Sequence, residues 1–242
     1  MNPVLLIPAR MASTRLPAKP LADIGGVPMI VRVWRHAVAA GLGPVVVAAG
    51  EAEIVAAITT CGGQAILTDP DLPSGSDRIW AALQRFDPKG AHDVVVNLQG
   101  DLPALDPGQL KAVAQALKQS GADIATLAAP IDNEADRVNP AVVKAVVAWD
   151  ASGNLGRALY FTRSTAPSGD GPLFHHVGLY AYRREALESF VALPPSPLEQ
   201  REKLEQLRAL EAGMSIAVAR VDEAPLSVDT PADLQRARSL LS

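Results

Sequence analysis

Short apolar runs alternate, over the first half of the chain, with longer segments whose apolar residues recur at helical spacing. The apolar runs predict buried strands at residues 3–8, 44–49, 64–68, 93–99 and 123–129. The amphipathic segments predict helices at residues 29–40, 51–61, 76–86 and 108–119. Because strand and helix alternate with short connections, we expect parallel strands joined by right-handed crossovers. Ligands should then bind beyond the carboxyl ends of these strands.

The pattern changes after about residue 131. Two apolar stretches, 142–150 and 154–161, flank a turn-rich junction and predict a β-hairpin. The remaining elements are strands at 175–183 and 214–221 and helices at 197–213 and 232–241. We therefore predict an α/β fold in which helices flank a Rossmann-like, mainly parallel sheet, with a smaller, more antiparallel lobe at about 131–213. We expect both parts to belong to one domain spanning 1–242.

Composition narrows the class of protein. The 242 residues are 48% hydrophobic, and no apolar run reaches the roughly 18 residues that cross a bilayer. Cys61 is the single cysteine, which excludes an internal disulfide and fits a reducing cytoplasm. The net charge of −4 argues against a general partner for nucleic acid or anionic membranes, although small anions need only a local cationic cluster. We expect a cytoplasmic protein with neither kind of partner.

A cationic cluster of this kind follows the first predicted strand. Arg10, Arg15 and Lys19 lie in one loop punctuated by prolines, and Ser13 and Thr14 add hydroxyls. Guanidinium groups chelate phosphate oxygens and lysine supplies a point charge, so the loop suits a polyphosphate. The predicted nucleotide contacts in this loop are Pro8, Ala9, Arg10, Ser13, Arg15 and Lys19. A solvated basic loop is the alternative.

Other predicted loops carry polar residues that suit the same site. Asp101 follows the strongest strand and could hold a metal against a triphosphate, while the Gln99 amide could pair with a base edge. Ser74 and Arg78 stand where the loop of residues 69–77 enters a helix, and Asp229 precedes the last helix. Each also fits an ordinary turn or helix cap.

These segments together resemble the CMP-KDO synthetases, which activate 3-deoxy-manno-octulosonate (KDO) with CTP. Residues 7–21 match the family pattern IPAR-x-x-STRLP-x-KPL at every fixed position. SGSDR, NLQGD, YFTRSTAP, FHHVGLYAYR, PSPLEQREKLEQLRAL and VDTPADL are similar to further family motifs. Leu102 stands where the family's QGDEP motif has an acidic residue.

The resemblance implies attack by the anomeric hydroxyl of KDO on the α-phosphorus of CTP, which yields CMP-KDO for lipopolysaccharide and releases diphosphate. It implies that the catalytic residues are Lys19, Arg10, Asp101 and Asp229. Two of these, Asp101 and Asp229, would hold Mg²⁺. Ser74, Arg78 and Gln99 would bind the cytidine part of CTP. The implied KDO contacts are Arg163, His176, Tyr180, Glu205 and Gln206. It also implies a homodimer.

Two alternatives stay open. A sister cytidylyltransferase for sialic acid or 8-amino-KDO would share the CTP half. A non-catalytic nucleotide-binding module would share only the fold.

Overall fold

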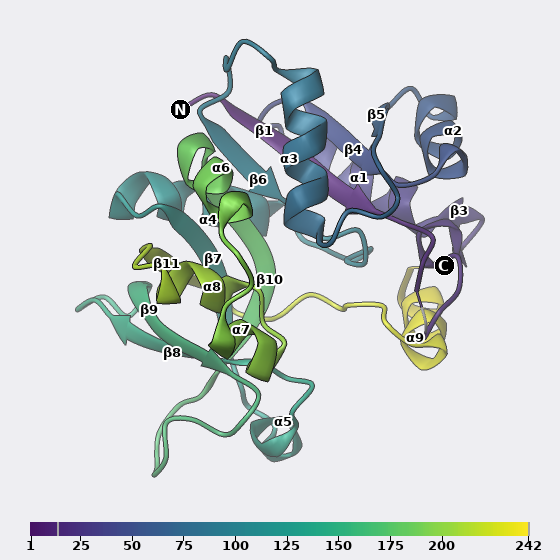
Figure 1. Cartoon of the computed structure of the whole chain (residues 1–242). Coiled ribbons are helices and arrows are strands. Elements are labelled where there is room, and N and C mark those ends of the chain that lie inside the picture. The colour runs from purple at the N-terminus through teal and green to yellow at the C-terminus, as the bar shows by residue number, and fades with distance from the viewer. Residues whose placement is uncertain (14, 242) are drawn as a thin grey trace. The chain divides into compact units, whose positions relative to one another are not determined.

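The computed structural model describes residues 1–13 and 15–241, so Thr14 of the cationic loop lies outside the described residues. The chain divides into two compact units (Figure 1). The first comprises Met1–Lys111 and Pro225–Ser242, and the second comprises Ala112–Ala224. Residues 131–213, where we expect the antiparallel lobe, belong to the second unit. The single-domain organisation stays a prediction.

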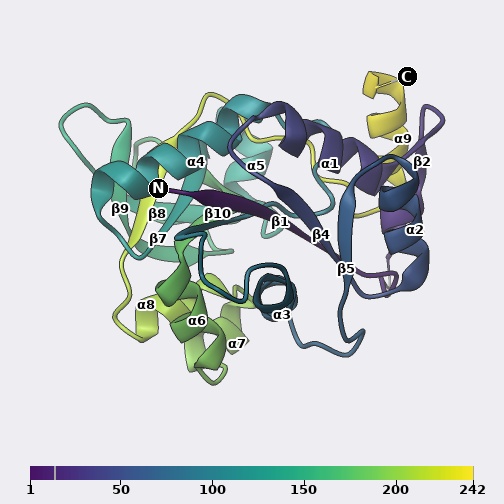
Figure 2. The same ribbon diagram turned by 90° about the horizontal axis from the view of Figure 1, so that it is seen from above.

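The first unit contains four parallel strands in the order β5-β4-β1-β6. They are β1 (Pro3–Ala9), β4 (Val45–Ala49), β5 (Gln64–Leu67) and β6 (Val94–Asn97). The helices that follow them are α1 (Met29–Ala39), α2 (Ala52–Thr60) and α3 (Gly75–Phe86). Figure 2 shows α1 and α3 on opposite faces of this sheet. Because both faces are covered, β4 is buried throughout, as its continuous apolar run predicts.

The loop after β1 contains structure that the sequence pattern does not reveal. It forms the 3₁₀ turn η1 (Lys19–Leu21) and a small ribbon of β2 (Asp23–Ile24) and β3 (Val27–Pro28). Gly25 and Gly26 have φ of 59° and 76°, the left-handed backbone that a two-residue hairpin turn needs. The last helix, α9 (Pro231–Leu241), packs on this ribbon through a buried cluster. That cluster comprises Ile24, Met29, Val228, Leu234 and Ala237.

The five strands of the second unit close into a small barrel in the order β10-β7-β11-β9-β8, because β8 also pairs with β10. They are β7 (Ile124–Pro130), β8 (Lys144–Trp149), β9 (Leu155–Thr162), β10 (Phe174–Arg183) and β11 (Ile216–Arg220). Only the β7–β11 pair is parallel. The protein is therefore mixed α/β, and the mainly parallel description fits the first unit alone.

Helices of the second unit correct one prediction. The single helix expected at 197–213 is wrong: α7 (Pro197–Glu202) and α8 (Gln206–Glu211) are separate helices. Lys203 ends α7 in the left-handed conformation, with φ of 58°, and the Arg163 guanidinium donates to the carbonyls of Glu202 and Lys203. The two short helices α5 (Glu134–Val138) and α6 (Arg184–Ala192) were not predicted, and α4 (Pro107–Ser120) contains the boundary between units. Among the described residues, none of the helices is long and apolar enough to cross a bilayer.

Candidate active site

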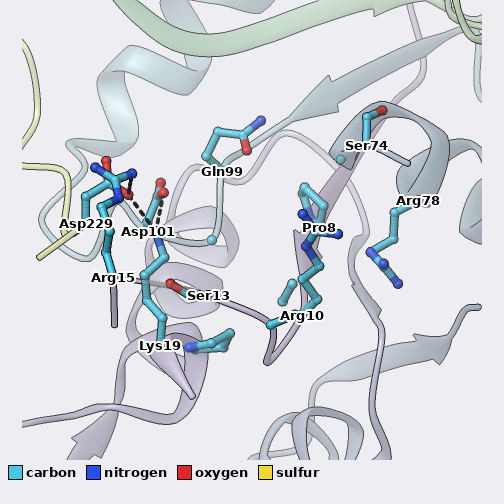
Figure 3. Close-up of a pocket in the computed structure, with 15 residues that line it drawn as sticks. Pro8, Arg10, Ser13, Arg15, Lys19, Ser74, Arg78, Gln99, Asp101 and Asp229 are labelled. Carbon is cyan, nitrogen blue, oxygen red and sulfur yellow. Dashed lines mark hydrogen bonds and ion pairs between the residues drawn. The ribbon is translucent and has the colours of Figure 1, made fainter. Parts of the chain in front are cut away.

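A polar cleft of about 430 Å³ opens in the first unit, beyond the carboxyl ends of β1 and β6 (Figure 3). Its position is the one expected for a ligand site on parallel strands. The cleft brings together every residue predicted for the nucleotide and the metal. These are Pro8, Ala9, Arg10, Ser13, Arg15, Lys19, Ser74, Arg78, Gln99, Asp101 and Asp229.

Lys19 joins two carboxylates in this cleft. Its Nζ lies 2.8 Å from Asp101 Oδ2 and 3.0 Å from Asp229 Oδ1. Arg15 adds a contact of 3.1 Å to the same Asp229 oxygen. Burial lowers the pKa of Lys19, but the attraction of Asp101 and Asp229 more than offsets this and leaves the pKa above its ordinary value. The ammonium is therefore charged at neutral pH, and both carboxylates point toward it.

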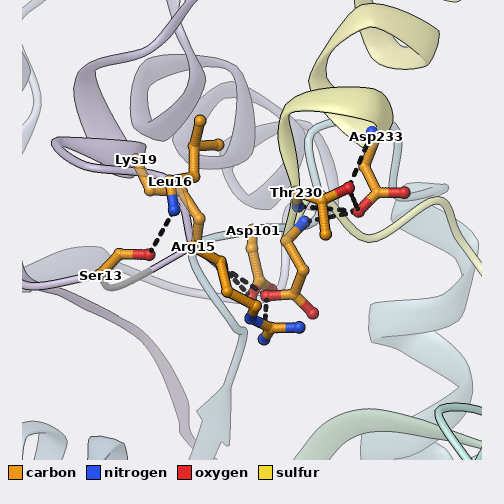
Figure 4. Close-up of polar contacts among 8 residues, drawn as sticks. Ser13, Arg15, Leu16, Lys19, Asp101, Thr230 and Asp233 are labelled. Atoms are coloured by element: carbon orange, nitrogen blue, oxygen red, sulfur yellow. Dashed lines mark hydrogen bonds and ion pairs between the residues drawn. The ribbon is translucent and has the colours of Figure 1, made fainter.

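Backbone and capping contacts hold Asp229 at this point, although it is far from Asp101 in sequence; Figure 4 shows the contacts of Thr230 and Asp233. The amide of Val228 donates to the carbonyl of Asp101 at 2.9 Å. Asp233 Oδ2 accepts from the amides of Asp229 and Thr230, at 3.1 and 2.8 Å, and from the Thr230 hydroxyl at 2.8 Å. Thr230 caps α9, since its Oγ1 accepts from Asp233 N at 3.2 Å.

Glycines allow the walls of the cleft to approach each other. A Cβ on Gly100 would stand 2.9 Å from the carbonyl oxygen of Pro8, closer than backbone atoms tolerate. A Cβ on Gly75 would meet the Pro8 ring at 3.4 Å. The loop after β6 and the start of α3 therefore both lie against the end of β1.

Ser74 and Arg78 have roles within the protein itself. Ser74 Oγ accepts from Asp77 N at 3.1 Å and donates to Asp77 Oδ2 at 2.7 Å, so it caps α3. Arg78 is only 2% exposed, and its guanidinium donates to Thr68 Oγ1 and to the carbonyls of Asp69 and Pro70. Arg78 therefore shapes the wall formed by residues 68–70.

The remaining predicted residues lie in the cleft with different environments. Arg10 is exposed, and Ser13 Oγ accepts from the amide of Leu16 at 3.3 Å, which steadies the loop after β1. The Gln99 side chain is half-buried and donates from Nε2 to Asn97 Oδ1 at 3.3 Å. Its amide projects from the end of β6, among the cleft residues of Figure 3.

The donor set of the cleft suits a hard cation that also binds other ligands. Asp101 Oδ2 and Asp229 Oδ1 each lie within 3.0 Å of Lys19 Nζ, so both oxygens can reach a single ion placed between them. Within residues 1–13 and 15–241, no group of three or more His, Cys, Asp or Glu side chains could hold a metal. An ion there would complete its shell with phosphate oxygens and water, as Mg²⁺ commonly does.

A second polar cluster lies in the second unit and contains most of the residues predicted for the sugar acid. The ring of His176 lies 5.5 Å from that of Tyr180, and its Nδ1 is 3.5 Å from Gln206 Nε2. Burial lowers the pKa of His176 to about 3, with a smaller effect of His175, so the imidazole is neutral at physiological pH. Burial, with Tyr182 and Glu205, raises the pKa of the Tyr180 hydroxyl, which stays protonated.

Arg163 and Glu205 have partners of their own. Besides the two carbonyls at the end of α7, the Arg163 guanidinium donates to the carbonyl of Pro140 at 3.0 Å. These three acceptors are neutral, so the cationic charge of Arg163 is not neutralised by them. Glu205 precedes α8, and its carboxylate lies 3.9 Å from Arg208.

Two residues of these clusters were missed in the sequence. Asp233 looks like a routine helix-start residue, and Thr126 sits inside the apolar run of β7. The Thr126 hydroxyl lies 3.0 Å from His176 Nε2. The only available signal for Thr126 was a polar residue in an otherwise apolar strand.

The chain is similar to known proteins over nearly its whole length. Residues 4–216 match the model of a family described as Cytidylyltransferase. Two relatives named 3-deoxy-manno-octulosonate cytidylyltransferase are similar over the full chain. The one from Parvibaculum lavamentivorans is 66% identical, with 100% of this chain and 93% of the relative covered, and the one from Paramagnetospirillum magneticum is 61% identical, with 100% and 98% covered. A solved structure of CMP:2-keto-3-deoxy-manno-octonic acid synthetase complexed with CTP is 38% identical, with a TM-score of 0.90 and 99% and 98% of the two chains covered.

Proposed function

Because the chain belongs to the 3-deoxy-manno-octulosonate cytidylyltransferase family, we propose that it transfers CMP from CTP to KDO and releases diphosphate. The product, CMP-KDO, would supply lipopolysaccharide biosynthesis. The observation that carries this proposal is the centre in which Lys19 lies between Asp101 and Asp229, at the carboxyl edge of a parallel sheet. A metal-bound triphosphate can bind at such a centre, because the carboxylates can hold its metal and the cation can contact its phosphates.

We assign the triphosphate of CTP to the loop after β1. Arg10, Arg15 and Lys19 supply positive charge there, and Ser13 supports the loop backbone. Arg15 is 64% exposed at its side chain and can turn toward a phosphate at little cost. Lys19 would exchange part of its carboxylate contacts for the phosphates. It would offset the charge that develops on the leaving diphosphate.

The cytosine end of CTP is assigned to the wall formed by β6 and α3. The Gln99 amide carries both a donor and an acceptor, which is what reading the edge of a base requires. Ser74 and Arg78 contribute through the shape of this wall, since their side chains cap α3 and anchor residues 68–70. Pro8 and Ala9 form the floor at the end of β1.

We also propose that Mg²⁺ binds at Asp101 and Asp229, which fit it by ligand type and by proximity. When bound, Mg²⁺ neutralises phosphate charge and lowers the pKa of the attacking hydroxyl. The residues of this chain would position CTP for in-line attack on the α-phosphorus. Such transfers depend on positioning and charge neutralisation more than on a side-chain base.

KDO is assigned to the cluster in the second unit. Its carboxylate is matched by the positive charge of the Arg163 guanidinium, which donates to the neutral carbonyls of Pro140, Glu202 and Lys203. Its hydroxyls are matched by three neutral side chains and one carboxylate, those of His176, Tyr180, Gln206 and Glu205. These residues distinguish the proposed substrate from other sugar acids.

An assay for diphosphate release with a panel of sugar acids tests the proposal. Purified protein is supplied with CTP and Mg²⁺, and with KDO, 8-amino-KDO or sialic acid in turn. We expect kcat/KM for KDO to exceed that for the other two acids by at least about tenfold, which corresponds to about 1.4 kcal/mol. Preference for another acid would reassign the substrate. CTP binding without diphosphate release for any acid would make the protein a non-catalytic nucleotide-binding module.

We further propose that the enzyme acts as a cytoplasmic homodimer with no nucleic-acid or membrane partner. Support comes from family membership, from the net charge of −4 and from the single cysteine. Light scattering during size-exclusion chromatography measures the mass of the assembly. A mass equal to one chain would contradict the dimer.

A further inference from the structure

Thr126 makes an unusual set of contacts at a bulge in the barrel of the second unit. Its side chain is fully buried on β7. Its hydroxyl lies 3.0 Å from His176 Nε2, 3.0 Å from the carbonyl oxygen of Val177 and 2.9 Å from that of Leu179. The two carbonyls flank the point where the register of β10 shifts between Val177 and Tyr180.

The chemistry of these three neighbours decides where the protons lie. A threonine hydroxyl has one hydrogen, and a carbonyl oxygen only accepts. If that hydrogen pointed to His176, the hydroxyl oxygen would face two carbonyl oxygens with no proton between them. The hydroxyl therefore donates to the carbonyls at the bulge and accepts from His176. His176 thus carries its proton on Nε2.

The other ring nitrogen of His176 is then left as an acceptor. Nδ1 lies 3.5 Å from Gln206 Nε2, at the outer limit of a hydrogen bond, so it has capacity for a stronger donor. The ring itself is held in place by Phe161, whose ring meets it edge-on at 4.8 Å, and by Tyr180. Burial keeps the pKa of His176 near 3, so a second proton does not compete for Nδ1 at neutral pH.

We propose that Thr126 is a positioning residue that fixes His176 in the Nε2–H tautomer, so that Nδ1 accepts a hydrogen bond from a hydroxyl of the sugar acid. The same hydroxyl ties the two ends of the bulge and so directs Tyr180 toward the same face as His176. This inference rests on the proposed function for its ligand, and on the geometry of Thr126 for the tautomer.

The first experiment reads the tautomer without any substrate. Long-range ¹H–¹⁵N correlation spectra of the whole protein distinguish a protonated from a bare ring nitrogen, and a His176→Asn variant assigns the signal among the four histidines. We expect wild type to show a neutral ring protonated at Nε2 near neutral pH. A ring protonated at Nδ1, or at both nitrogens, would overturn the proposal even if the enzyme uses KDO.

The second experiment compares two substitutions of similar size. Thr126→Val removes the hydroxyl, and Thr126→Ser keeps it. In Thr126→Val we expect the spectrum to show a mixture of the Nε2–H and Nδ1–H tautomers of His176. We also expect KM for KDO to rise about tenfold or more, with KM for CTP within about twofold of wild type. In Thr126→Ser we expect both properties to stay near wild type. A folded Thr126→Val with an unchanged tautomer and an unchanged KM for KDO would refute the inference.

The two arms also separate this inference from the proposed function. If wild type transfers CMP to no sugar acid while His176 carries its proton on Nε2, the proposed function fails and the role of Thr126 in the tautomer stands. If wild type uses KDO but His176 carries its proton on Nδ1, the proposed function stands and the role of Thr126 in the tautomer fails.

Discussion

Replacing Lys19 by methionine tests the role of the positive charge between Asp101 and Asp229. Methionine keeps an unbranched side chain one atom shorter but removes the ammonium that lies 2.8 Å from Asp101 and 3.0 Å from Asp229. At an effective dielectric constant near 20, each such contact represents about 5–6 kcal/mol of attraction before desolvation. Lys19 is 17% exposed at its side chain and the aspartates are 25% and 39% exposed, so the cost of burying Lys19 and solvent screening offset most of this.

We therefore expect a small effect on stability and a large effect on catalysis. The free energy of unfolding of Lys19→Met should fall by about 1 kcal/mol, since the two aspartates then lie close together without the ammonium between them, and Arg15 contacts Asp229. Removing the ammonium that offsets the charge on the leaving diphosphate should cost about 3 kcal/mol or more of transition-state stabilisation, which is about 150-fold in kcat/KM.

The pH dependence separates the two effects. Because the pKa of Lys19 is raised on folding, its contribution to stability is fully present below the unfolded value and is lost as pH rises through the folded value. The difference in stability between wild type and Lys19→Met should therefore be constant through neutral pH and vanish in strong alkali.

Diphosphate release with CTP, KDO and Mg²⁺ measures the catalytic effect, and urea denaturation measures stability. Lys89→Met is the matched control, because Lys89 is an exposed lysine of the same unit that does not line the cleft. The control should keep wild-type kcat/KM. A Lys19→Met enzyme that is folded and within about threefold of wild type would refute the reasoning about Lys19.

Three further substitutions follow from the geometry. Asp233→Ala should lower the free energy of unfolding by about 1–2 kcal/mol, because it removes the side-chain acceptor of the Asp229 and Thr230 amides, and should also lower kcat; urea melts and the diphosphate assay check both. Gly100→Ala should raise KM for CTP, since the new Cβ meets the Pro8 carbonyl at 2.9 Å; calorimetric CTP affinity equal to wild type would contradict this. The pKa of His176 falls from an unfolded value near 6.5 to about 3, so wild type should lose about 2 kcal/mol of stability between roughly pH 7 and 5 that His176→Asn does not lose, as urea melts at both pH values would reveal.

The parts of the fold that the sequence predicts best are those in which local pattern and burial agree. Strand β6 begins with three consecutive valines, Val94–Val96, and the burial of these residues follows from that apolar run. The edge at which Arg10, Lys19 and Asp101 meet also follows, because parallel strands bring their carboxyl ends together. The identity of KDO as the acceptor came from family resemblance.

Other features depend on partners that are distant in the chain. At the break between α7 and α8 the Glu202 carbonyl accepts from the Arg163 guanidinium, 39 residues earlier in the chain. The contact between Lys19 and Asp229 spans 210 residues, so no local spacing predicts it. The role of Arg78 in the wall of the cleft is missed for a different reason: two of its three acceptors are the backbone carbonyls of Asp69 and Pro70, which any residue type would supply.

The fate of the three phosphorus atoms of CTP tests the central claim most directly. ³¹P NMR of the purified enzyme with CTP, KDO and Mg²⁺ follows each phosphorus through the reaction. We predict that the α resonance converts to that of a phosphodiester joined to the sugar, while the β and γ phosphorus atoms leave together as diphosphate. Release of orthophosphate with formation of CDP, or an unchanged CTP spectrum, would contradict the account.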